Sequence, residues 1–125
     1  MSAAAPATEI VIGDAVIAGV AARAAAAVAG VRRLEPGVLG LVGQLARTGR
    51  QLWTGQEPAP AGGVRVRRAG QWLKIHVDLT MSGGARVGEV GRMVQREVAR
   101  MVAEQTGVAV DEVVVTVLDI EPGQP

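Results

Sequence analysis

The pattern of hydrophobic and polar positions in the last third of the chain predicts two strands on either side of one helix. Residues 71–81 alternate strictly between apolar and polar side chains, as a strand with one buried face does. Residues 85–107 instead repeat their apolar side chains with the period of a helix that buries one face. Residues 112–120 alternate again, but Val114 and Leu118 also make the second face apolar, which predicts a central or covered strand.

The first half of the chain has shorter patterns. Residues 9–12 and 31–34 favour two short strands. A helix is predicted over residues 15–29, with Asp14 as its N-cap, because a carboxylate there accepts hydrogen bonds from the first free amides. Residues 64–68 alternate and lead through a turn into the strand that follows, which predicts a hairpin.

These elements predict a two-layer α+β domain of β-α-β-β-α-β order. We expect a mostly antiparallel or mixed sheet with both helices on one face. The domain is predicted to span residues 9–121, between a disordered N-terminus (1–8) and a disordered tail (122–125). Residues 35–63 form a loop-rich insertion within it. Inside this insertion, residues 38–53 are predicted to be a weak helix or a structured loop, because three glycines interrupt their apolar stripe.

Strand alternation also predicts which side chains share a face of the sheet. The apolar residues of 71–81 point toward the helices, and their polar neighbours point away. We hypothesise that the face turned away from the helices binds a partner, because it gathers cationic side chains around a tryptophan. Its members are Arg65, Arg67, Trp72, Lys74 and His76.

Composition adds an unusual core and an uneven charge. The chain is 49% hydrophobic yet has no Phe or Tyr, so the core is aliphatic, and we expect modest stability or support from a partner chain. A net charge of +1 argues against general attraction to nucleic acid or membranes. However, residues 32–68 hold seven arginines and two acids, whereas four acids and no base follow residue 110. This imbalance fits either a solvated surface or a basic contact face.

No constellation for catalysis or metal binding stands out. Cysteine is absent, which excludes disulfides, thiol nucleophiles and thiolate metal sites. His76 is the only histidine and has no serine or threonine in an identifiable motif with it. The acids are scattered, and neither Gly62–Gly63 nor Gly83–Gly84 forms a phosphate-binding motif. We therefore predict no catalytic residue, no cofactor, no metal and no small-molecule substrate.

Nucleic acid and the membrane are alternative partners. Some RNA-binding modules share this element order, but they stack bases on several aromatics, and Trp72 is the only one on this face. The apolar stretch 15–31 is interrupted by Arg23 and is too weak to span a membrane. Residues 38–53 fit either an interfacial membrane helix or, as we prefer, a glycine-rich loop packed on its own domain. We expect a cytoplasmic protein without direct membrane insertion.

Several segments together resemble a known family. The order and spacing of these apolar and glycine positions resemble the bacterial alkaline-shock and general-stress family of envelope-stress-response proteins. The matching segments are Ile10–Ile17, Val28–Val31, Gly63–Val66, the strand 73–81, Val90–Val98, Thr106–Val108, Val113–Val117 and Ile120.

The resemblance implies a small α+β protein without catalysis. It implies a scaffold or adaptor in the envelope stress response, peripheral at the inner face of the cell membrane through an integral membrane anchor protein. It also implies self-association as a homo-oligomer. A separate hypothesis is an accessory subunit whose last strand pairs with its own copy. The chain departs from the family at Met81–Gly83, where an aromatic is common, and over residues 35–62.

Overall fold

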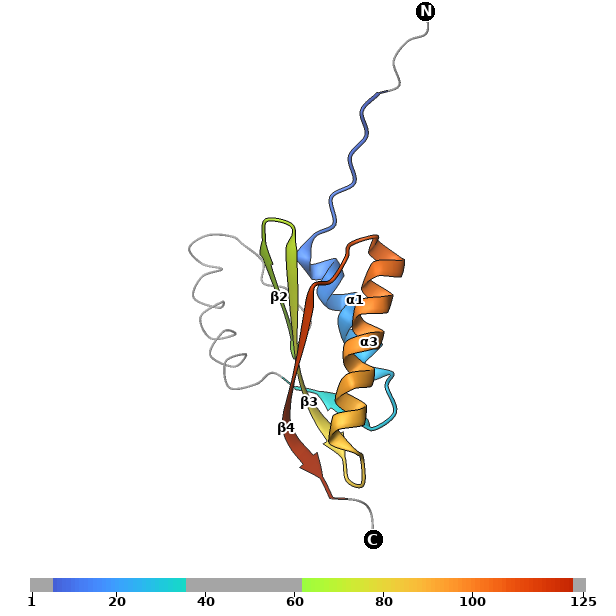
Figure 1. The fold of residues 1–125 in the computed structure, drawn as a ribbon, viewed down its shortest axis with the longest axis vertical. Coiled ribbons are helices and arrows are strands. Elements are labelled where there is room, and N and C mark those ends of the chain that lie inside the picture. Colours follow the sequence, from blue (N-terminus) through green and yellow to red (C-terminus); the bar gives the residue numbers. More distant parts are fainter. Residues whose placement is uncertain (1–5, 36–61, 123–125) are drawn as a thin grey trace, which may run out of the picture.

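The computed structural model describes residues 6–35 and 62–122. It confirms the predicted α+β class and the two layers, because two helices lie side by side over one face of a four-stranded sheet (Figure 1). The elements in chain order are α1 (Asp14–Ala26), β1 (Val31–Leu34), β2 (Val64–Ala69), β3 (Trp72–Ser82), α3 (Val87–Thr106) and β4 (Glu112–Glu121).

The longest strand, β3, organises the sheet. β4 runs parallel to β3 along one side. On the other side β2 pairs antiparallel with residues 72–77, and β1 pairs antiparallel with residues 79–81. β1 and β2 therefore lie end to end along the same side of β3, and the sheet is mixed, as predicted.

The junction between β1 and β2 lies at Asp78 of β3. The backbone N–H of Glu35 donates to the carbonyl of Asp78 at 2.9 Å, and the N–H of Asp78 donates to the carbonyl of Gly63 at 2.8 Å. Glu35 thus extends β1, and Gly63 extends β2, as far as Asp78 of β3. The chain leaves the sheet and returns to it at the same point.

The core lies between the sheet and the helices and is aliphatic throughout. The alternation predicted for residues 71–81 is confirmed, since every second side chain of β3 is buried beneath the helices. α1 supplies small side chains, which let it approach the sheet closely, and α3 supplies one valine on each turn of its buried face. The most deeply buried members are Ile17, Ala18, Ala21, Ala25, Ile75, Val77, Leu79, Met81, Val94, Val98 and Val102.

The sequence predicts the end of α3 to within one residue, whereas it predicts neither the N-cap nor the end of α1 correctly. α3 ends at Gly107, as expected, where a left-handed backbone (φ 74°) lets the amide donate to Ala103. For α1 the prediction of Asp14 as N-cap is wrong. Gly13 holds that position, and Asp14 is the first helical residue, where its carboxylate lies 2.8 Å from Arg68. α1 also ends at Ala26, three residues before the predicted end.

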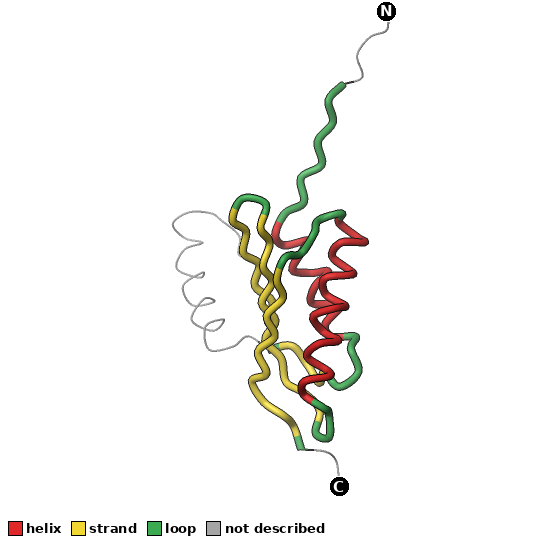
Figure 2. The backbone as a smooth tube through the Cα atoms, viewed as in Figure 1, coloured by secondary structure: helices red, strands yellow, loops and turns green. Residues whose placement is uncertain are grey.

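Two strand predictions are wrong. Residues 9–12 belong to an extended segment outside the sheet that runs away from the body of the molecule (Figure 2). β4 is an edge strand and not a central one, because among the residues that the structure describes it pairs with β3 alone. The predicted helix or loop at 38–53 lies outside the described residues.

In the two described stretches of chain, neither helix combines the length and the apolar character needed to cross a bilayer.

Gly63 is predicted to be essential to the junction at Asp78. Its φ is +86°, and a Cβ there would lie 3.0 Å from the Glu35 amide nitrogen and 3.1 Å from the Asp78 carbonyl oxygen. Gly63→Ala should therefore lower the free energy of unfolding by about 1–3 kcal/mol, measured by urea denaturation. Gly62→Ala is the matched control, because no atom lies within 4 Å of a Cβ at that position. Equal stability of the two variants would contradict the prediction.

Candidate partner-binding face

The pairing of β2 with β3 brings the five predicted site residues onto one face of the sheet. Arg65 lies opposite His76, and Arg67 lies opposite Lys74. Directly paired residues share a face, and every second residue of β3 shares that face with them. The residues Arg65, Arg67, Trp72, Lys74 and His76 therefore all lie on the side of the sheet turned away from the helices, and we call them the outer basic face.

Trp72 and Arg67 are the members of this face that a partner can reach most readily. Trp72 begins β3 beside the β2–β3 turn, and 52% of its surface is exposed. Arg67 is exposed two residues before the end of β2. Tryptophan and arginine are the residue types that contribute most often to binding energy at protein interfaces. The pair thus supplies an apolar anchor and a cation on the same face, offset by two positions across the paired strands.

Arg65 differs from Arg67 because its charge is matched within the domain. Its Nη2 atom lies 3.1 and 3.3 Å from the two carboxylate oxygens of Asp78. Asp78 is only 3% exposed, and a buried carboxylate without a cation would be costly. Arg65 therefore has a structural role in the sheet. Sequence reasoning placed both residues on the outer face but missed this pair, although residues offset by two positions across paired strands lie within reach of a long side chain.

His76 adds little positive charge to the outer basic face. Burial lowers the pKa of His76, and the charges of Arg65 and Lys74 lower it further, with a smaller contribution from Arg67. Asp78 opposes this shift without cancelling it. The imidazole is therefore neutral near pH 7. The Nζ atom of Lys74 lies 3.8 Å from Glu112 of β4, a weak and partly exposed pair.

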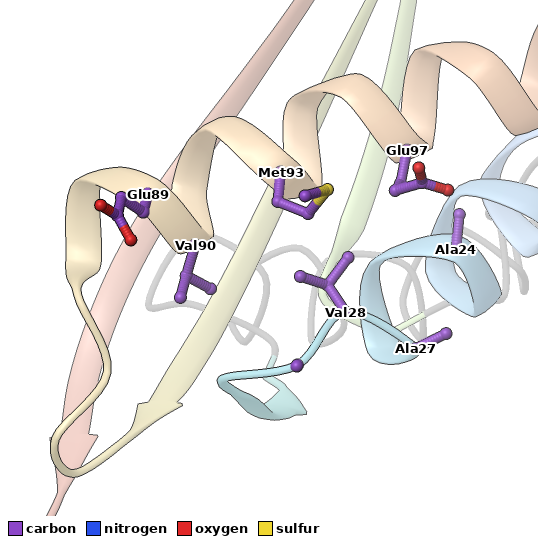
Figure 3. A pocket seen from close by; sticks show the side chains of 8 residues that line it. Ala24, Ala27, Val28, Glu89, Val90, Met93 and Glu97 are labelled. Carbon is purple, nitrogen blue, oxygen red and sulfur yellow. The ribbon is translucent and has the colours of Figure 1, made fainter.

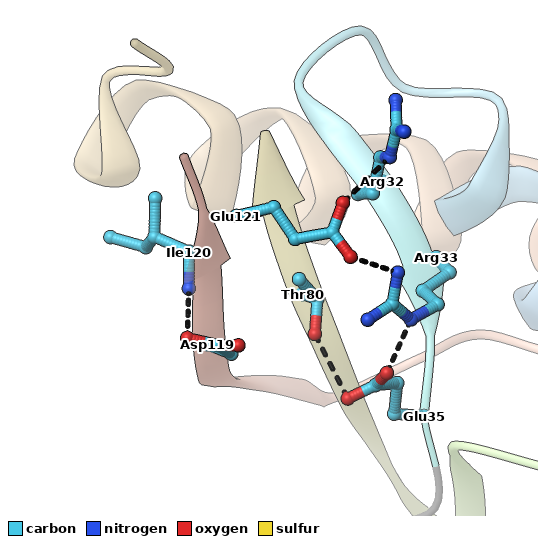
Figure 4. A network of polar contacts seen from close by, with 7 residues as sticks. All are labelled: Arg32, Arg33, Glu35, Thr80, Asp119, Ile120 and Glu121. Carbon is cyan, nitrogen blue, oxygen red and sulfur yellow. Dashed lines mark hydrogen bonds and ion pairs between the residues drawn. The ribbon is translucent and has the colours of Figure 1, made fainter. Parts of the chain in front are cut away.

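A network of ion pairs covers the same side of the sheet at its other end (Figure 4). Arg33 of β1 donates to both Glu35 and Glu121, and Arg32 lies 2.9 Å from Glu121. The buried Thr80 hydroxyl donates to Glu35 at 2.9 Å. These contacts join β1, β3 and β4.

Arg33 keeps the two carboxylates of this network ionised. Hydrogen bonds from Arg33 lower the pKa of Glu35 and of Glu121, so both stay ionised. Carboxylates held in this way are poor general acids, and we assign the network a structural role. The sequence signal for it was the contrast between the basic residues 32–68 and the acidic end of the chain, which here meet.

A groove between the two helices lies on the opposite layer (Figure 3). Its volume is about 450 Å³, and small or aliphatic side chains dominate its lining. Apart from two carboxylates, its lining side chains carry no nucleophile or base. Its lining residues include Ala24, Val28, Val90 and Met93, with the carboxylates of Glu89 and Glu97 along the α3 side.

Metal binding finds no support in the described part of the chain. Within residues 6–35 and 62–122, no three His, Asp or Glu side chains form a group suited to a metal ion. That the protein has no metal, cofactor or catalytic residue stays a prediction.

Comparison with known proteins gives one match. The family model of the alkaline shock protein 23 family, described as having a cell envelope-related function, matches residues 3–122. No curated protein and no solved structure is significantly similar to the chain.

The lowered pKa of His76 predicts a pH-dependent stability. As pH falls below 6.5, the usual pKa of histidine, the unfolded chain takes up a proton that the folded chain does not. The unfolded state then binds more protons, so stability should be full above this pH and decrease as the solution is acidified toward about pH 5. Urea denaturation across this range measures the slope, and His76→Gln should flatten it. An unchanged slope in that variant would show that other groups cause it.

Proposed function

Because the chain belongs to the alkaline shock protein 23 family, whose function is related to the cell envelope, we propose that it is a non-enzymatic scaffold or adaptor in the envelope stress response. The match confirms the family predicted from the sequence motifs. In this proposal the protein binds a membrane-anchored partner protein, is peripheral at the inner face of the membrane through that partner, and self-associates.

The observation that supports a binding role is the composition of the outer basic face. Trp72 is half exposed beside Arg67, and Lys74 lies directly across from Arg67 in the strand register. An exposed indole with cations around it suits a partner surface that offers an apolar pocket and acidic side chains. The surface is built on paired strands, which hold it in a defined geometry without the partner.

RNA binding through the same face is the weaker proposal. Base stacking needs a platform of aromatic rings, and in the described part of the chain Trp72 is the single Trp, Tyr or Phe residue. The family match gives RNA binding no support.

The proposal is tested by cross-linked pull-down of the tagged protein, with membrane and soluble fractions analysed separately. We expect near-stoichiometric recovery of one integral membrane protein from the membrane fraction. Trp72→Ala and Arg67→Glu should each lower this recovery about tenfold or more, because truncation of an interface anchor costs about 2 kcal/mol. Both side chains are exposed, so the variants should fold normally, which circular dichroism checks.

Arg96→Glu is the matched control, since it reverses an exposed arginine on α3, in the other layer. Arg65 is unsuitable as a control or a test residue, because its loss would leave Asp78 buried without its cation. Equal capture by all variants would remove the outer basic face from the proposal. Recovery of RNA or ribosomal proteins alone, with nothing from the membrane, would favour RNA binding.

A further inference from the structure

The extended segment before α1 has the composition of a strand but pairs with no strand within residues 6–35 and 62–122. Ile10 is 87% exposed and Val11 is 78% exposed, the two highest values among the large apolar residues of the described chain. The segment Thr8–Ile12 combines a threonine with three β-branched aliphatic residues, the types enriched in strands. We call Thr8–Ile12 the arm.

The base of the arm is held in place, because Ile12 is partly buried against the core, whereas Ile10 and Val11 are exposed. Arg68, at the end of β2, donates to the carbonyl of Ile12 at 2.8 Å, and its Nε atom lies 2.8 Å from Asp14. From this anchor the chain runs away from the molecule along its long axis (Figure 1). A five-residue arm in extended form reaches about 17 Å, the length of an ordinary strand.

The sheet offers an open edge for such a strand at β4. Among the described residues β4 pairs only with β3, so its other side presents backbone groups without a strand partner. Near its start, the Val113 carbonyl accepts a hydrogen bond from the Gln95 side chain of α3 at 3.1 Å. In the second half of β4 the Ile120 N–H donates to the side chain of Asp119 at 2.8 Å (Figure 4), and 42% of Leu118 and 47% of Ile120 are exposed.

A shift in register exposes Leu118. Val117 pairs with Leu79 and Asp119 pairs with Thr80, so Leu118 between them has no partner on β3. The edge formed by β1 and β2 is different, because neither strand has a large apolar residue exposed and both are rich in arginine. The apolar character that the arm requires is therefore found on β4.

We propose that the arm of one copy adds as a further strand to the open edge of β4 in a second copy, over the half that contains Leu118 and Ile120. Strand addition supplies the missing backbone hydrogen bonds and covers the exposed side chains of both copies. The arm and the second half of β4 lie at opposite ends of the long axis (Figure 1), so the contact is head-to-tail. Repetition of such a contact gives a chain of copies or a closed ring.

This inference rests on the self-association that is part of the proposed function, and sedimentation velocity of the full chain tests it. The wild-type protein should show a mass that increases with concentration. The arm variant, Ile10→Asp with Val11→Asp, and the edge variant, Leu118→Lys with Ile120→Lys, should each sediment as monomers, because charge opposes burial in a sheet edge. Val16→Asp is the matched control, since it makes the same change at another exposed valine and should assemble like the wild type.

Mixing the two monomeric variants distinguishes head-to-tail pairing from other contacts. The edge variant keeps its arm and the arm variant keeps its edge, so an equimolar mixture should form one-to-one dimers that do not grow. Wild-type protein that stays monomeric at all concentrations, assembly that survives in the arm variant, or a mixture that stays monomeric would each overturn the inference. The pull-down reads the proposed partner binding separately, and both variants should still capture the membrane protein because the outer basic face is unchanged.

Discussion

The backbone of Asp78 is the point on which the sheet depends. Its N–H and C=O bind the two chain segments that end β1 and begin β2, so these short strands follow one another along the same side of β3. The side chain of Asp78 in turn holds Arg65 of β2. Asp78, in the middle of the longest strand, thus binds the end of β1, the start of β2 and the side chain of Arg65. Arg65 lies two residues before the exposed Arg67 on β2.

The two faces of the sheet have different roles. The face toward the helices is filled by aliphatic side chains and carries the packing of the domain. The other face is polar, and its charges fall into two groups. The charges near Asp78 and Glu121 are matched by partners within the chain, whereas Trp72 and Arg67 are exposed. Stability and the proposed recognition therefore use different residues of the same strands.

The pattern of apolar and polar residues predicted the features that depend on neighbouring residues, such as which side chains of a strand are buried. It failed to predict the features that depend on pairing between distant segments of the chain. The alternation of residues 71–81 predicted which side chains are buried. Together with the alternation of residues 64–68, it also predicted that the five site residues share one face. A similar pattern in residues 9–12 predicted a strand, but a strand forms only by pairing, and these residues pair with no strand that the structure describes. The apolar second face of β4 could not distinguish a central strand from an exposed edge. The pair of Arg65 with Asp78 also escaped prediction, because register decides it.

Glu35 and Gly63 both hydrogen-bond to Asp78 of β3, and this affects how many residues the chain can accept between them. Since the segment between them begins and ends at neighbouring points, the geometry of the sheet sets no required length for it. The entropy of closing such a connection grows only with the logarithm of its length, so each doubling costs about 0.6 kcal/mol. This position is therefore a natural place for lineages to exchange one insert for another, and for an engineer to graft a fluorescent domain, while the sheet beneath keeps its pairing.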